Sequence, residues 1–405
     1  MLKIENPIKK RTAEVINLLL FLVFLPFTFR KKKSLPESPI KILILRLDHI
    51  GDVVMATGVY KHIKNRFPKC KISVMTGRWG TDILEGNPYI DEIIIHNCPW
   101  WKKVRKEKAG YLKWLFGELP PLIKKIRGES FDIGIDLRGD FRHILFFLFL
   151  GKVKYKISYN RSGGEYLLER AADYNLNLHE IEKNFKLLEA IGIKNIPTEE
   201  KSPQIFLFEK EQIEAKNIFE ATNIPKNSLK IIMHPGAGNK SRMWGHKNFA
   251  SFINHISEKY SVSVFLIGDR KEYRICEAIK QLSGENVYNT AGVMKIRESA
   301  ALIEQGDMFI GNDSSMGHIA ASFGVPSLIL LGPTTPERCK PYNKRLTCIY
   351  HKFPCSPCLQ NRCVLTGTEQ GECMESIKVE EVALLFEKIV REQINRYNKT
   401  QEGEV

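Results

Sequence analysis

Several patterns are missing from this sequence, and each absence narrows the class of protein. The apolar strands expected at 41–47 and 229–234 are not followed by a GxGxxG motif, which disfavours a nicotinamide dehydrogenase. Zinc-finger, RNA-recognition and homeodomain signatures are also missing, which argues against a nucleic-acid-binding module. Six of the nine cysteines lie between Cys339 and Cys373, so the cysteines do not form a disulfide framework for the whole chain.

Long hydrophobic runs are scarce as well. The longest, residues 15–29, is interrupted by Pro26, and its fifteen residues fall short of the roughly 20 that a spanning helix needs. No small-residue cleavage site follows, and basic residues flank both ends of the run. We therefore predict that residues 1–39 form a basic, apolar segment that lies on an anionic membrane surface. The alternatives are a helix buried on the domain surface and, less favoured, a membrane span.

Length and charge point to the size and the partners of the protein. With 405 residues, two domains are the default expectation, and 43% apolar with 26% charged residues is an ordinary globular composition. The net charge of +15 predicts anionic partners, which include nucleic acid, anionic lipid and phosphorylated small molecules.

Strands and helices alternate in two successive regions, which are separated by a polar, proline-containing segment at 196–204. Two strand-first regions in tandem predict an α/β fold with two Rossmann-like domains that face each other across a cleft. The ten-residue apolar run after Phe141 is too short to span a bilayer and predicts a core helix. The expected divisions are the N-terminal segment 1–39, a first domain 40–200, a second domain 201–376 and a C-terminal helix with tail 377–405.

The chain is organised around residues 306–342. A short buried strand is expected to end in the polar turn 312–315, and a helix then runs from Met316 to Phe323. The start of a helix presents unpaired backbone N–H groups and a partial positive charge, both of which suit phosphate. Because ligands of open α/β sheets bind at the carboxyl ends of strands, this turn predicts a site for a nucleotide diphosphate.

Three further strand ends carry polar residues. Gly51 and Asp52 follow the first strand, where Asp52 is either a general base or a plain helix cap. A helix N-terminus lowers the basicity of such a carboxylate, and this counts against the first alternative. The glycine loop at 234–238, with Arg242 beyond it, suits a diphosphate, although a solvated basic loop fits equally well. Asp269 is either a ribose-binding carboxylate or a helix-capping one.

Five motifs together resemble glycosyltransferase family 9, the heptosyltransferases of lipopolysaccharide core assembly. The similarity covers roughly residues 40–375 and rests on ILILRLDHIGDVVMATGVYKHIK (42–64), IDLRGDFRHILFFLFLG (135–151), MHPGAGNKSRMWGHKNFA (233–250), NTAGVMKIRESAALI (289–303) and NDSSMGHIAASFGVPSLILLGPT (312–334). The resemblance implies a GT-B fold, an inverting mechanism, ADP-heptose as the usual donor and no obligatory metal for catalysis.

The resemblance also implies site residues. Asp52 would be the catalytic base, and Arg242 stands where the family has a lysine, which keeps the charge but changes its geometry. Met294 falls in the turn that packs on the nucleotide base, although a core methionine is an equally good interpretation. The expected donor-binding residues are Gly51, Gly236, Gly238, Arg242, Asp269, Met294, Asp313, Ser314, Ser315, Gly317 and His318.

Basic residues of the first domain are candidates for the acceptor. Arg138, Arg142 and Arg161 could meet phosphate or carboxylate groups of a lipid-linked saccharide, although most surface cations bind nothing specific.

A cysteine cluster is a separate candidate site. Cys355, Cys358, Cys363 and Cys373 are four potential thiolate ligands within nineteen positions, which would suit a structural zinc ion or an iron–sulfur cluster. The alternative is a set of reduced or redox-active thiols, since persistent disulfides are rare in a reducing cytoplasm.

Taken together, the sequence predicts a cytoplasmic glycosyltransferase that is peripherally attached to the inner face of the cytoplasmic membrane. Its expected substrates are ADP-heptose and a lipopolysaccharide core or lipid A–Kdo type acceptor, with no nucleic-acid partner. Three alternatives stay open: a different nucleotide sugar, a non-catalytic nucleotide- or lipid-binding adaptor, and, least favoured, single-stranded nucleic-acid binding through the basic, aromatic stretch 100–127.

Overall fold

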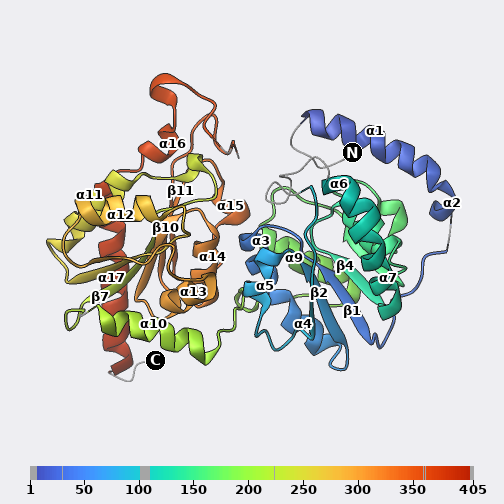
Figure 1. Ribbon diagram of the computed structural model, residues 1–405, viewed down its shortest axis with the longest axis horizontal. Helices are drawn as coiled ribbons and strands as arrows, with labels where there is room; N and C mark the ends of the chain where they lie inside the picture. The colour runs from blue at the N-terminus through green and yellow to red at the C-terminus, as the bar shows by residue number, and fades with distance from the viewer. Residues whose placement is uncertain are drawn as a thin grey trace. The chain divides into compact units, whose positions relative to one another are not determined.

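The chain forms two compact units, the first ending at Phe206 and the second beginning at Leu207 (Figure 1). This computed structural model describes residues 7–29, 31–100, 110–222, 224–358, 360 and 362–401. Each unit is a three-layer α/β structure with its own six-stranded sheet. The predicted α/β class with two Rossmann-like domains is confirmed.

The N-terminal unit has strand order β3-β2-β1-β4-β5-β6, and the registered strand pairs are parallel. Its central strand β1 is a continuous apolar run whose last four residues are fully buried, as expected for a strand covered by helices on both faces. Its strands are β1 (Lys41–Leu45), β2 (Lys71–Thr76), β3 (Glu92–Ile95), β4 (Ile133–Asp136), β5 (Tyr155–Tyr159) and β6 (Arg170–Ala172).

The helices of this unit begin before the sheet and then alternate with its strands. They are α1 (Pro7–Val23), α2 (Leu25–Thr28), α3 (Ile50–Ala56), α4 (Gly58–Arg66), α5 (Arg78–Leu84), α6 (Gly110–Lys113), η1 (Trp114–Glu118), α7 (Leu119–Glu129), α8 (Phe141–His143), η2 (Ile144–Phe149) and α9 (Glu180–Leu188).

The C-terminal unit repeats the same strand order. Its sheet has the order β12-β11-β10-β7-β8-β9. When β7 is counted as the first strand and the sheet is read from the β9 edge, this is the same order as in the first sheet. Both sheets therefore have the doubly wound arrangement in which the strand order reverses beside the first strand. The strands are β7 (Leu229–His234), β8 (Val262–Leu266), β9 (Val287–Asn289), β10 (Met308–Asn312), β11 (Ser327–Leu331) and β12 (Leu346–Tyr350).

Helices cover both faces of this second sheet as well (Figure 1). The long C-terminal helix α17 adds Val382, Phe386 and Ile389 to the core, which confirms the predicted closing amphipathic helix. The helices are α10 (Glu209–Ala221), α11 (His246–Ser257), α12 (Tyr273–Leu282), α13 (Ile296–Glu304), α14 (Ser315–Ser322), α15 (Pro336–Cys339), α16 (Glu372–Glu375) and α17 (Val379–Gln401).

One segment differs from the sequence-based expectation in detail. The predicted core helix beginning at Phe141 is one α-helical turn, α8, continued by the π-helical η2, and η2 packs in the core through Phe147 and Leu148. Pro120 and Pro121 stand in the first turn of α7, which continues directly from the π-helical η1. Residues 101–109 of the basic stretch lie outside the described part.

None of the helices in the described ranges is both long and apolar enough to cross a membrane. The apolar run at 15–29 covers the second half of α1 and the whole of α2.

Candidate functional site

In the C-terminal unit, the sheet order reverses between β7 and β10. These two strands are direct neighbours in parallel register, so their carboxyl ends bring the loop after His234 beside the turn after Asn312. The Asn312 side chain joins them, because its Nδ2 donates to Pro235 O at 2.7 Å and its Oδ1 accepts from Trp244 N at 3.1 Å. The predicted glycine loop and phosphate turn therefore form one site in this unit, at the position where doubly wound sheets bind ligands.

Asp313 orients a cation at this site. Its buried carboxylate pairs with Arg242 Nη1 at 3.1 Å and accepts a hydrogen bond from the Thr334 hydroxyl. Arg242 Nε is also buried, and it has no hydrogen-bond partner among the residues that the structure describes. A buried guanidinium nitrogen without an acceptor is costly, so Arg242 is prepared to receive one from a ligand.

The first turn of α14 is left without its usual side-chain cap. Ser314 is the N-cap residue, but its hydroxyl makes no capping hydrogen bond and instead contacts His234 Nδ1 at 2.9 Å. The backbone N–H groups at the start of α14, including that of Ser315, consequently lack the hydroxyl acceptor that a capping serine supplies. Together with the partial positive charge of the helix end, this favours an anion next to Arg242.

Two other expected residues of α14 face the interior. His318 is buried, and a side chain at Gly317 would approach within 3.0 Å of Ile329 Cδ1 on β11. Gly317 is therefore explained by close packing of α14 on its neighbouring strand, while its backbone N–H stays a predicted phosphate contact.

His234 connects this turn to a second carboxylate. Its Nε2 lies 3.3 Å from Glu272 Oε2, so that Ser314, His234 and Glu272 form a continuous chain of polar contacts. Burial raises the pKa of Glu272, but the hydrogen bond and charge of His234 outweigh this and lower the pKa below its ordinary value. A Cβ at Gly236 would overlap Glu272 Oε1, which explains why a glycine stands there.

Asp269 has a local role in the structure. Its Oδ1 accepts hydrogen bonds from Lys271 N at 2.8 Å and Glu272 N at 3.1 Å, in the turn that leads into α12. Asp269 thus closes the turn before α12, whose N-cap is Glu272, and it is the Glu272 carboxylate that points toward the loop after β7.

Gly238 and Met294 lie at the edge of the same unit. No described atom comes within 4 Å of a Cβ built at Gly238, so packing inside the unit does not require a glycine there. Met294 is only partly buried and lies outside the hydrophobic core, which makes the core-methionine interpretation wrong. Whether these two residues contact a nucleotide stays a prediction.

The N-terminal unit has the corresponding reversal between β1 and β4, and charged side chains occupy it. Arg46 and Asp48 follow β1 and are both buried, with Arg46 Nη1 at 3.3 Å from Asp48 Oδ2. Arg138, which follows β4, pairs with the other oxygen of Asp48. Asp48 therefore joins the two strand ends, and two arginines balance its charge.

Asp52 lies in the first turn of α3, beside this cluster. The N-cap of α3 is His49, and Asp52 closes a capping box because its Oδ2 accepts from His49 N at 3.3 Å. Its Oδ1 lies 3.6 Å from Arg46 Nη2, and the side chain is 28% exposed. Asp52 is thus not the N-cap itself, and its side chain is partly exposed to solvent. Gly51, an expected donor-binding residue, is a helical residue in the first turn of α3.

The predicted acceptor arginines converge on one loop. Asp140 pairs with Arg142 Nη2 at 2.6 Å and lies 3.7 Å from Arg138 Nε, while Arg161 Nη1 donates to Arg138 O at 3.3 Å. Burial, followed by the nearby charge of Arg161, lowers the pKa of Arg138 to about 9. The structure therefore brings all three arginines together.

A buried carboxylate shapes that loop. Asp136, the last residue of β4, accepts hydrogen bonds from Gly139 N at 2.8 Å, Asp140 N at 3.0 Å and the Ser158 hydroxyl at 2.7 Å. Asp136 thus fixes the backbone that carries Arg138 and Arg142.

The expected metal site at the four cysteines is not supported. Among the residues that the structure describes, no three His, Cys, Asp or Glu side chains are grouped so that they could hold a metal ion. None of the nine cysteines, all of which lie in the described ranges, forms a disulfide, and Cys363 Sγ accepts a hydrogen bond from Gly371 N. Burial, and then the charges of the other three cysteines, raise the pKa of Cys373 to about 11, which favours its neutral thiol over a thiolate ligand.

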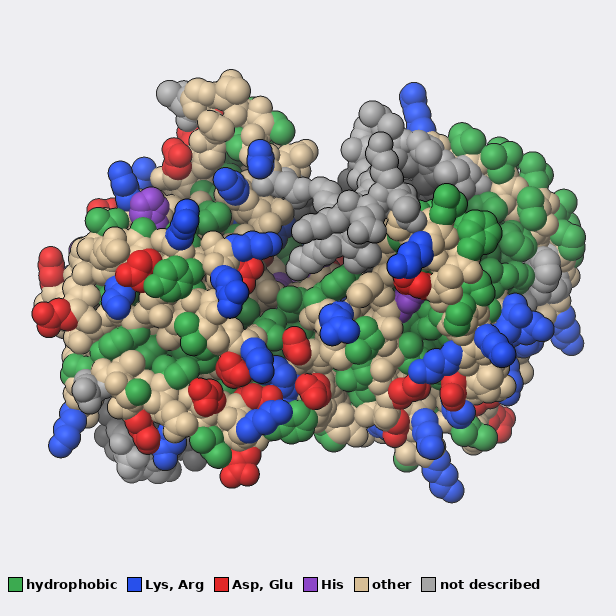
Figure 2. Space-filling view, viewed as in Figure 1, with side chains coloured by type: hydrophobic (Ala, Val, Ile, Leu, Met, Phe, Trp, Pro, Cys, Tyr) green, Lys and Arg blue, Asp and Glu red, His purple; other side chains and the backbone are tan. Residues whose placement is uncertain are grey.

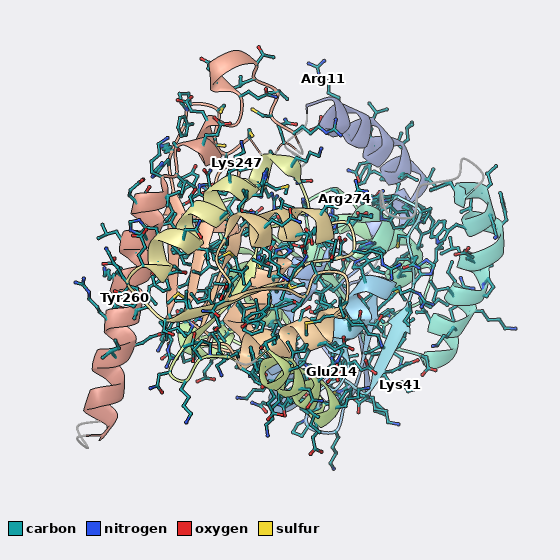
Figure 3. The ribbon with its side chains drawn as sticks, turned by 60° about the vertical axis from the view of Figure 1, so that its left-hand side comes forward. Arg11, Lys41, Glu214, Lys247, Tyr260 and Arg274 are labelled. Carbon is teal, nitrogen blue, oxygen red and sulfur yellow. The ribbon has the colours of Figure 1, made fainter. Side chains whose placement is uncertain are left out.

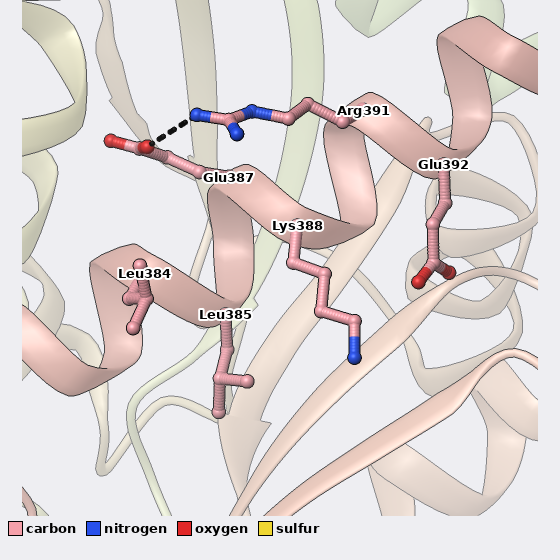
Figure 4. Close-up of a pocket in the computed structure, with 6 residues that line it drawn as sticks. All are labelled: Leu384, Leu385, Glu387, Lys388, Arg391 and Glu392. Carbon is pink, nitrogen blue, oxygen red and sulfur yellow. Dashed lines mark hydrogen bonds and ion pairs between the residues drawn. The ribbon is translucent and has the colours of Figure 1, made fainter.

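A hollow of about 390 Å³ along α17 is unrelated to these strand ends (Figure 4). The side chains that line it belong to α17 alone, and Glu387 there pairs with Arg391 at 3.4 Å and with Lys259 at 2.9 Å. It contains no residue from a strand end, and we do not assign it to substrate.

Sequence reasoning gave no separate role to several residues of these two sites, although His234 and Asn312 lie in the loop 234–238 and the turn 312–315 that it singled out. Each of them stands at or near a strand end, and that position was the available signal, but most of the contacts that join them reach tens of residues along the chain. They are Arg46, Asp48, Asp136, His234, Glu272, Asn312 and Thr334.

Comparison with known proteins places this geometry in a family. The model of glycosyltransferase family 9 (heptosyltransferase) matches residues 121–368. The lipopolysaccharide core heptosyltransferase OpsX of Haemophilus influenzae is 24% identical over 313 residues, which are 76% of this chain and 83% of that relative.

Solved structures share the fold. The E. coli ADP-heptose lps heptosyltransferase II has a TM-score of 0.69 at 19% identity, over 87% of this chain and 99% of that one. The E. coli heptosyltransferase WaaC with ADP has a TM-score of 0.64 at 14% identity, over 86% of this chain and 100% of that one. The fold is therefore the expected GT-B fold. Because the family model covers more than half of its 405 residues, this chain belongs to glycosyltransferase family 9 and is a glycosyltransferase.

Proposed function

We propose that this enzyme transfers heptose, or a related sugar, from ADP-heptose to a lipopolysaccharide core or lipid A–Kdo type acceptor with inversion at the anomeric carbon. The names of its relatives support the sugar and the acceptor class, since OpsX is called a lipopolysaccharide core heptosyltransferase. The WaaC structure with ADP supports ADP as the nucleotide of the donor, because its fold matches 86% of this chain.

One observation carries the donor assignment. At the end of β10, the buried Arg242 Nε without a described partner lies in the same site as the first turn of α14, whose N-cap hydroxyl is directed to His234. Both groups donate to anions, and Asp313 and Thr334 hold Arg242 in place. A nucleotide diphosphate bound here would supply the missing acceptors.

In the proposed transfer step, Asp52 acts as the general base. Its carboxylate takes the proton of an acceptor hydroxyl while that oxygen forms a bond to the anomeric carbon of the donor sugar. The bond from this carbon to the diphosphate breaks on the opposite face, and the electron pair leaves with ADP. Arg242 and the amides at Ser314, Ser315 and Gly317 stabilise the negative charge that the diphosphate gains.

The position of Asp52 is compatible with this role. It lies in the first turn of α3 with its side chain 28% exposed, and Arg46 Nη2, 3.6 Å from Oδ1, orients the carboxylate.

Arg138, Arg142 and Arg161 are proposed to bind phosphate or carboxylate groups of the acceptor. Their partners in the structure are carboxylates, a carbonyl group and aromatic faces, so the cations are already oriented: Arg142 stacks on Trp100 at 4.4 Å and Arg161 on Tyr174 at 4.9 Å. A lipid-linked acceptor of this class would place the enzyme at the inner face of the cytoplasmic membrane.

The test is a transfer assay with purified protein, a panel of ADP-, UDP- and GDP-sugars, and lipid A–Kdo acceptors. We expect transfer from ADP-heptose with inverted anomeric configuration. A thermal-shift series run alongside separates the other candidate functions: stabilisation by ADP without turnover would indicate a nucleotide-binding adaptor, and selective turnover of a UDP-sugar would change the donor. Neither transfer nor donor hydrolysis with any pair would overturn the proposal.

A further inference from the structure

Helix α1 and the short α2 are fixed to the N-terminal unit along one side. Asn17 Oδ1 accepts from Gly164 N at 3.1 Å, and the rings of Phe21 and Phe24 pack edge-on against Tyr166 and Phe149 with centroids 5.4 and 5.3 Å apart. Asn17, Phe21 and Phe24 are three and four residues apart, which is the spacing of one helix face. The helix therefore has a defined inner face and a defined outer face.

The outer face of α1 is apolar and open to solvent. Val15, Leu18, Leu19 and Leu22 follow the same helical spacing, and Leu18 and Leu22 are 59% and 57% exposed. Phe29, just after α2, is 83% exposed. In Figure 2 the hydrophobic side chains gather along this helix. A contiguous apolar stripe of this kind marks an interaction surface.

A second apolar edge belongs to the same unit. Leu112 of α6 and Phe116 of η1 are 62% and 76% exposed, whereas Trp114 between them is buried and packs against Phe146 with ring centroids 5.3 Å apart. Both edges therefore pack on η2: Phe24, between α1 and α2, packs on Phe149, and Trp114 of η1 packs on Phe146. α1 and the start of α6 also lie at the same end of the unit in Figure 1.

Basic residues flank the apolar stripe. Arg11 at the beginning of α1 is exposed and points away from the unit (Figure 3), and Lys31, Lys32 and Lys33 are exposed directly after α2. From residue 7 to residue 33 the sequence holds seven basic residues, Lys9, Lys10, Arg11, Arg30, Lys31, Lys32 and Lys33, and a single acidic one, Glu14. An apolar helix face with cations at both ends is the pattern of a helix that lies in the interface of an anionic bilayer.

We propose that α1, α2 and the α6–η1 edge form one surface, called here the lipid-docking surface, that binds the face of an anionic phospholipid bilayer. The inference deepens the proposed function, since it names the lipid class and the residues that make the contact. Charge decides between occupants: a second copy would bring its own cations against these, whereas an anionic bilayer attracts each of them by about 1 kcal/mol.

The surface is continuous with the acceptor arginines. Asn17 binds Gly164, three residues after Arg161, and η2 continues directly from α8, which contains Arg142. A unit docked in this way holds its arginine cluster next to the lipid headgroups, where the charged groups of a lipid-linked saccharide begin. The docking surface would thus select the substrate by its location as well as by its charge.

Vesicle flotation of the full-length protein tests the proposal without any need for turnover. We expect the parent to float with vesicles of phosphatidylethanolamine and phosphatidylglycerol, to bind phosphatidylcholine vesicles about tenfold more weakly, and to lose binding to the anionic vesicles at high salt. The double variant Leu18→Glu/Leu22→Glu and the triple variant Lys31→Ser/Lys32→Ser/Lys33→Ser should each lose about tenfold or more in affinity, and Phe116→Glu somewhat less.

Leu282→Glu is the matched control, because Leu282 is a 52% exposed leucine of the C-terminal unit, and it should bind as the parent does. Equal binding by the parent and by Leu18→Glu/Leu22→Glu, or failure of the parent to bind anionic vesicles, would overturn the proposal. A vesicle-free dimer that Leu18→Glu/Leu22→Glu dissociates would also overturn it, since the surface would then join two copies of the chain.

A second measurement keeps this proposal separate from the proposed function. The α1 variants should turn over a short water-soluble acceptor at the parental rate and lose activity only on acceptor embedded in vesicles. If neither the parent nor any variant shows transfer, but the flotation results are as expected, the lipid-docking surface is supported and the proposed reaction is wrong.

Discussion

In the N-terminal unit, the point where the strand order reverses is occupied by the protein's own charges, with Arg46 and Arg138 on either side of the buried Asp48. In the C-terminal unit the same topological position holds glycine-containing loops and the N-terminus of α14, which has no side-chain cap. It also holds the buried Arg242 Nε, which has no hydrogen-bond acceptor among the described residues. One sheet order thus positions both sites, while the side chains decide what each site does. The first is balanced internally, and the second is left with donors for an anion.

This difference predicts how each unit responds to substitution. Charges that satisfy one another contribute to folding, so their loss should appear mainly as lost stability. Donors left without acceptors cost stability in the free protein and are stabilised by ligand, so their loss should appear mainly as lost affinity or rate. Asp52 belongs to the first group by its contacts, since one of its oxygens closes a capping box and the other lies 3.6 Å from Arg46. Its loss should nevertheless appear mainly as lost rate, because it is the proposed general base.

The largest effect is expected at Asp52. Asp52→Ala should lower kcat by about 10²- to 10⁴-fold, because it removes the proposed general base, and should leave the thermal shift given by ADP unchanged. Asp52→Asn is the matched control, since the asparagine Oδ1 can still accept the hydrogen bond from His49 N in the capping box but cannot take up the proton. Equal inactivity of both variants supports the base; recovery of activity in the asparagine variant would reduce Asp52 to a capping residue.

Arg242 comes next. Arg242→Ala should weaken ADP binding about 10- to 100-fold, as expected for charge-assisted hydrogen bonds to phosphate, and Arg242→Lys should lose less because it keeps the charge. Calorimetric titration with ADP measures both. Arg274→Ala, an exposed arginine of α12 in the same unit, is the control. If Arg242→Ala bound ADP like the parent, the unpartnered Nε would be irrelevant to the donor.

How much of this arrangement the sequence predicted depends on the range of the interaction. The strands were predicted because β1, β7 and β10 are short apolar runs, and the sites because polar residues follow their ends, so local patterns sufficed. The contact of Ser314 with His234 joins residues 80 positions apart and exists because β7 and β10 are neighbours in register. Local propensity predicts Ser314 as a cap and does not reveal that its hydroxyl has another partner.

Cysteine spacing was misleading for the same reason. The CxxC pattern beginning at Cys355 fits one half of a metal site, but the positions of Cys363 and Cys373 depend on how the loop packs. In the structure Cys363 accepts from Gly371 N, and the Cys373 sulfur would lie 3.1 Å from a Cβ at Gly332. Spacing along the chain carries no information about these contacts. The same holds for Asp136, whose hydrogen bonds reach Ser158, 22 residues away.

In the N-terminal unit, Asp140 tests the idea that its charges serve the fold. Burial raises the pKa of Asp140, but His143, Arg142 and Arg138 outweigh this and hold it well below the ordinary 3.8. A lowered carboxyl pKa stabilises the fold above the unfolded pKa and loses this contribution as the pH falls below it. Asp140→Asn should therefore reduce the free energy of unfolding by about 1–2 kcal/mol at pH 7, since the partly exposed Arg142 weakens the pair.

Denaturant unfolding from pH 7 to pH 3 measures this difference. The gap between parent and Asp140→Asn should narrow below about pH 4, because there the Asp140 carboxyl of the unfolded parent takes up a proton while that of the folded parent stays ionised. Glu199→Gln, an exposed carboxylate of the same unit, should show no such gap. A gap that stays constant with pH would mean that the variant disturbs packing rather than charge.

The smallest effect concerns the contact between His234 and Ser314. His234→Ala and Ser314→Ala should each weaken ADP binding about fivefold, and the double variant should be no weaker than the single ones, because both changes break the same contact. The control cycle pairs His234→Ala with Ser257→Ala, whose hydroxyl bonds to Ile253 O within α11, and its effects should add. Additive effects for His234 and Ser314 would mean that the serine acts on its own, as a cap of α14. The amides of that turn would then already be partly satisfied, and the two units would no longer differ in the way that makes one of them a site for an anion.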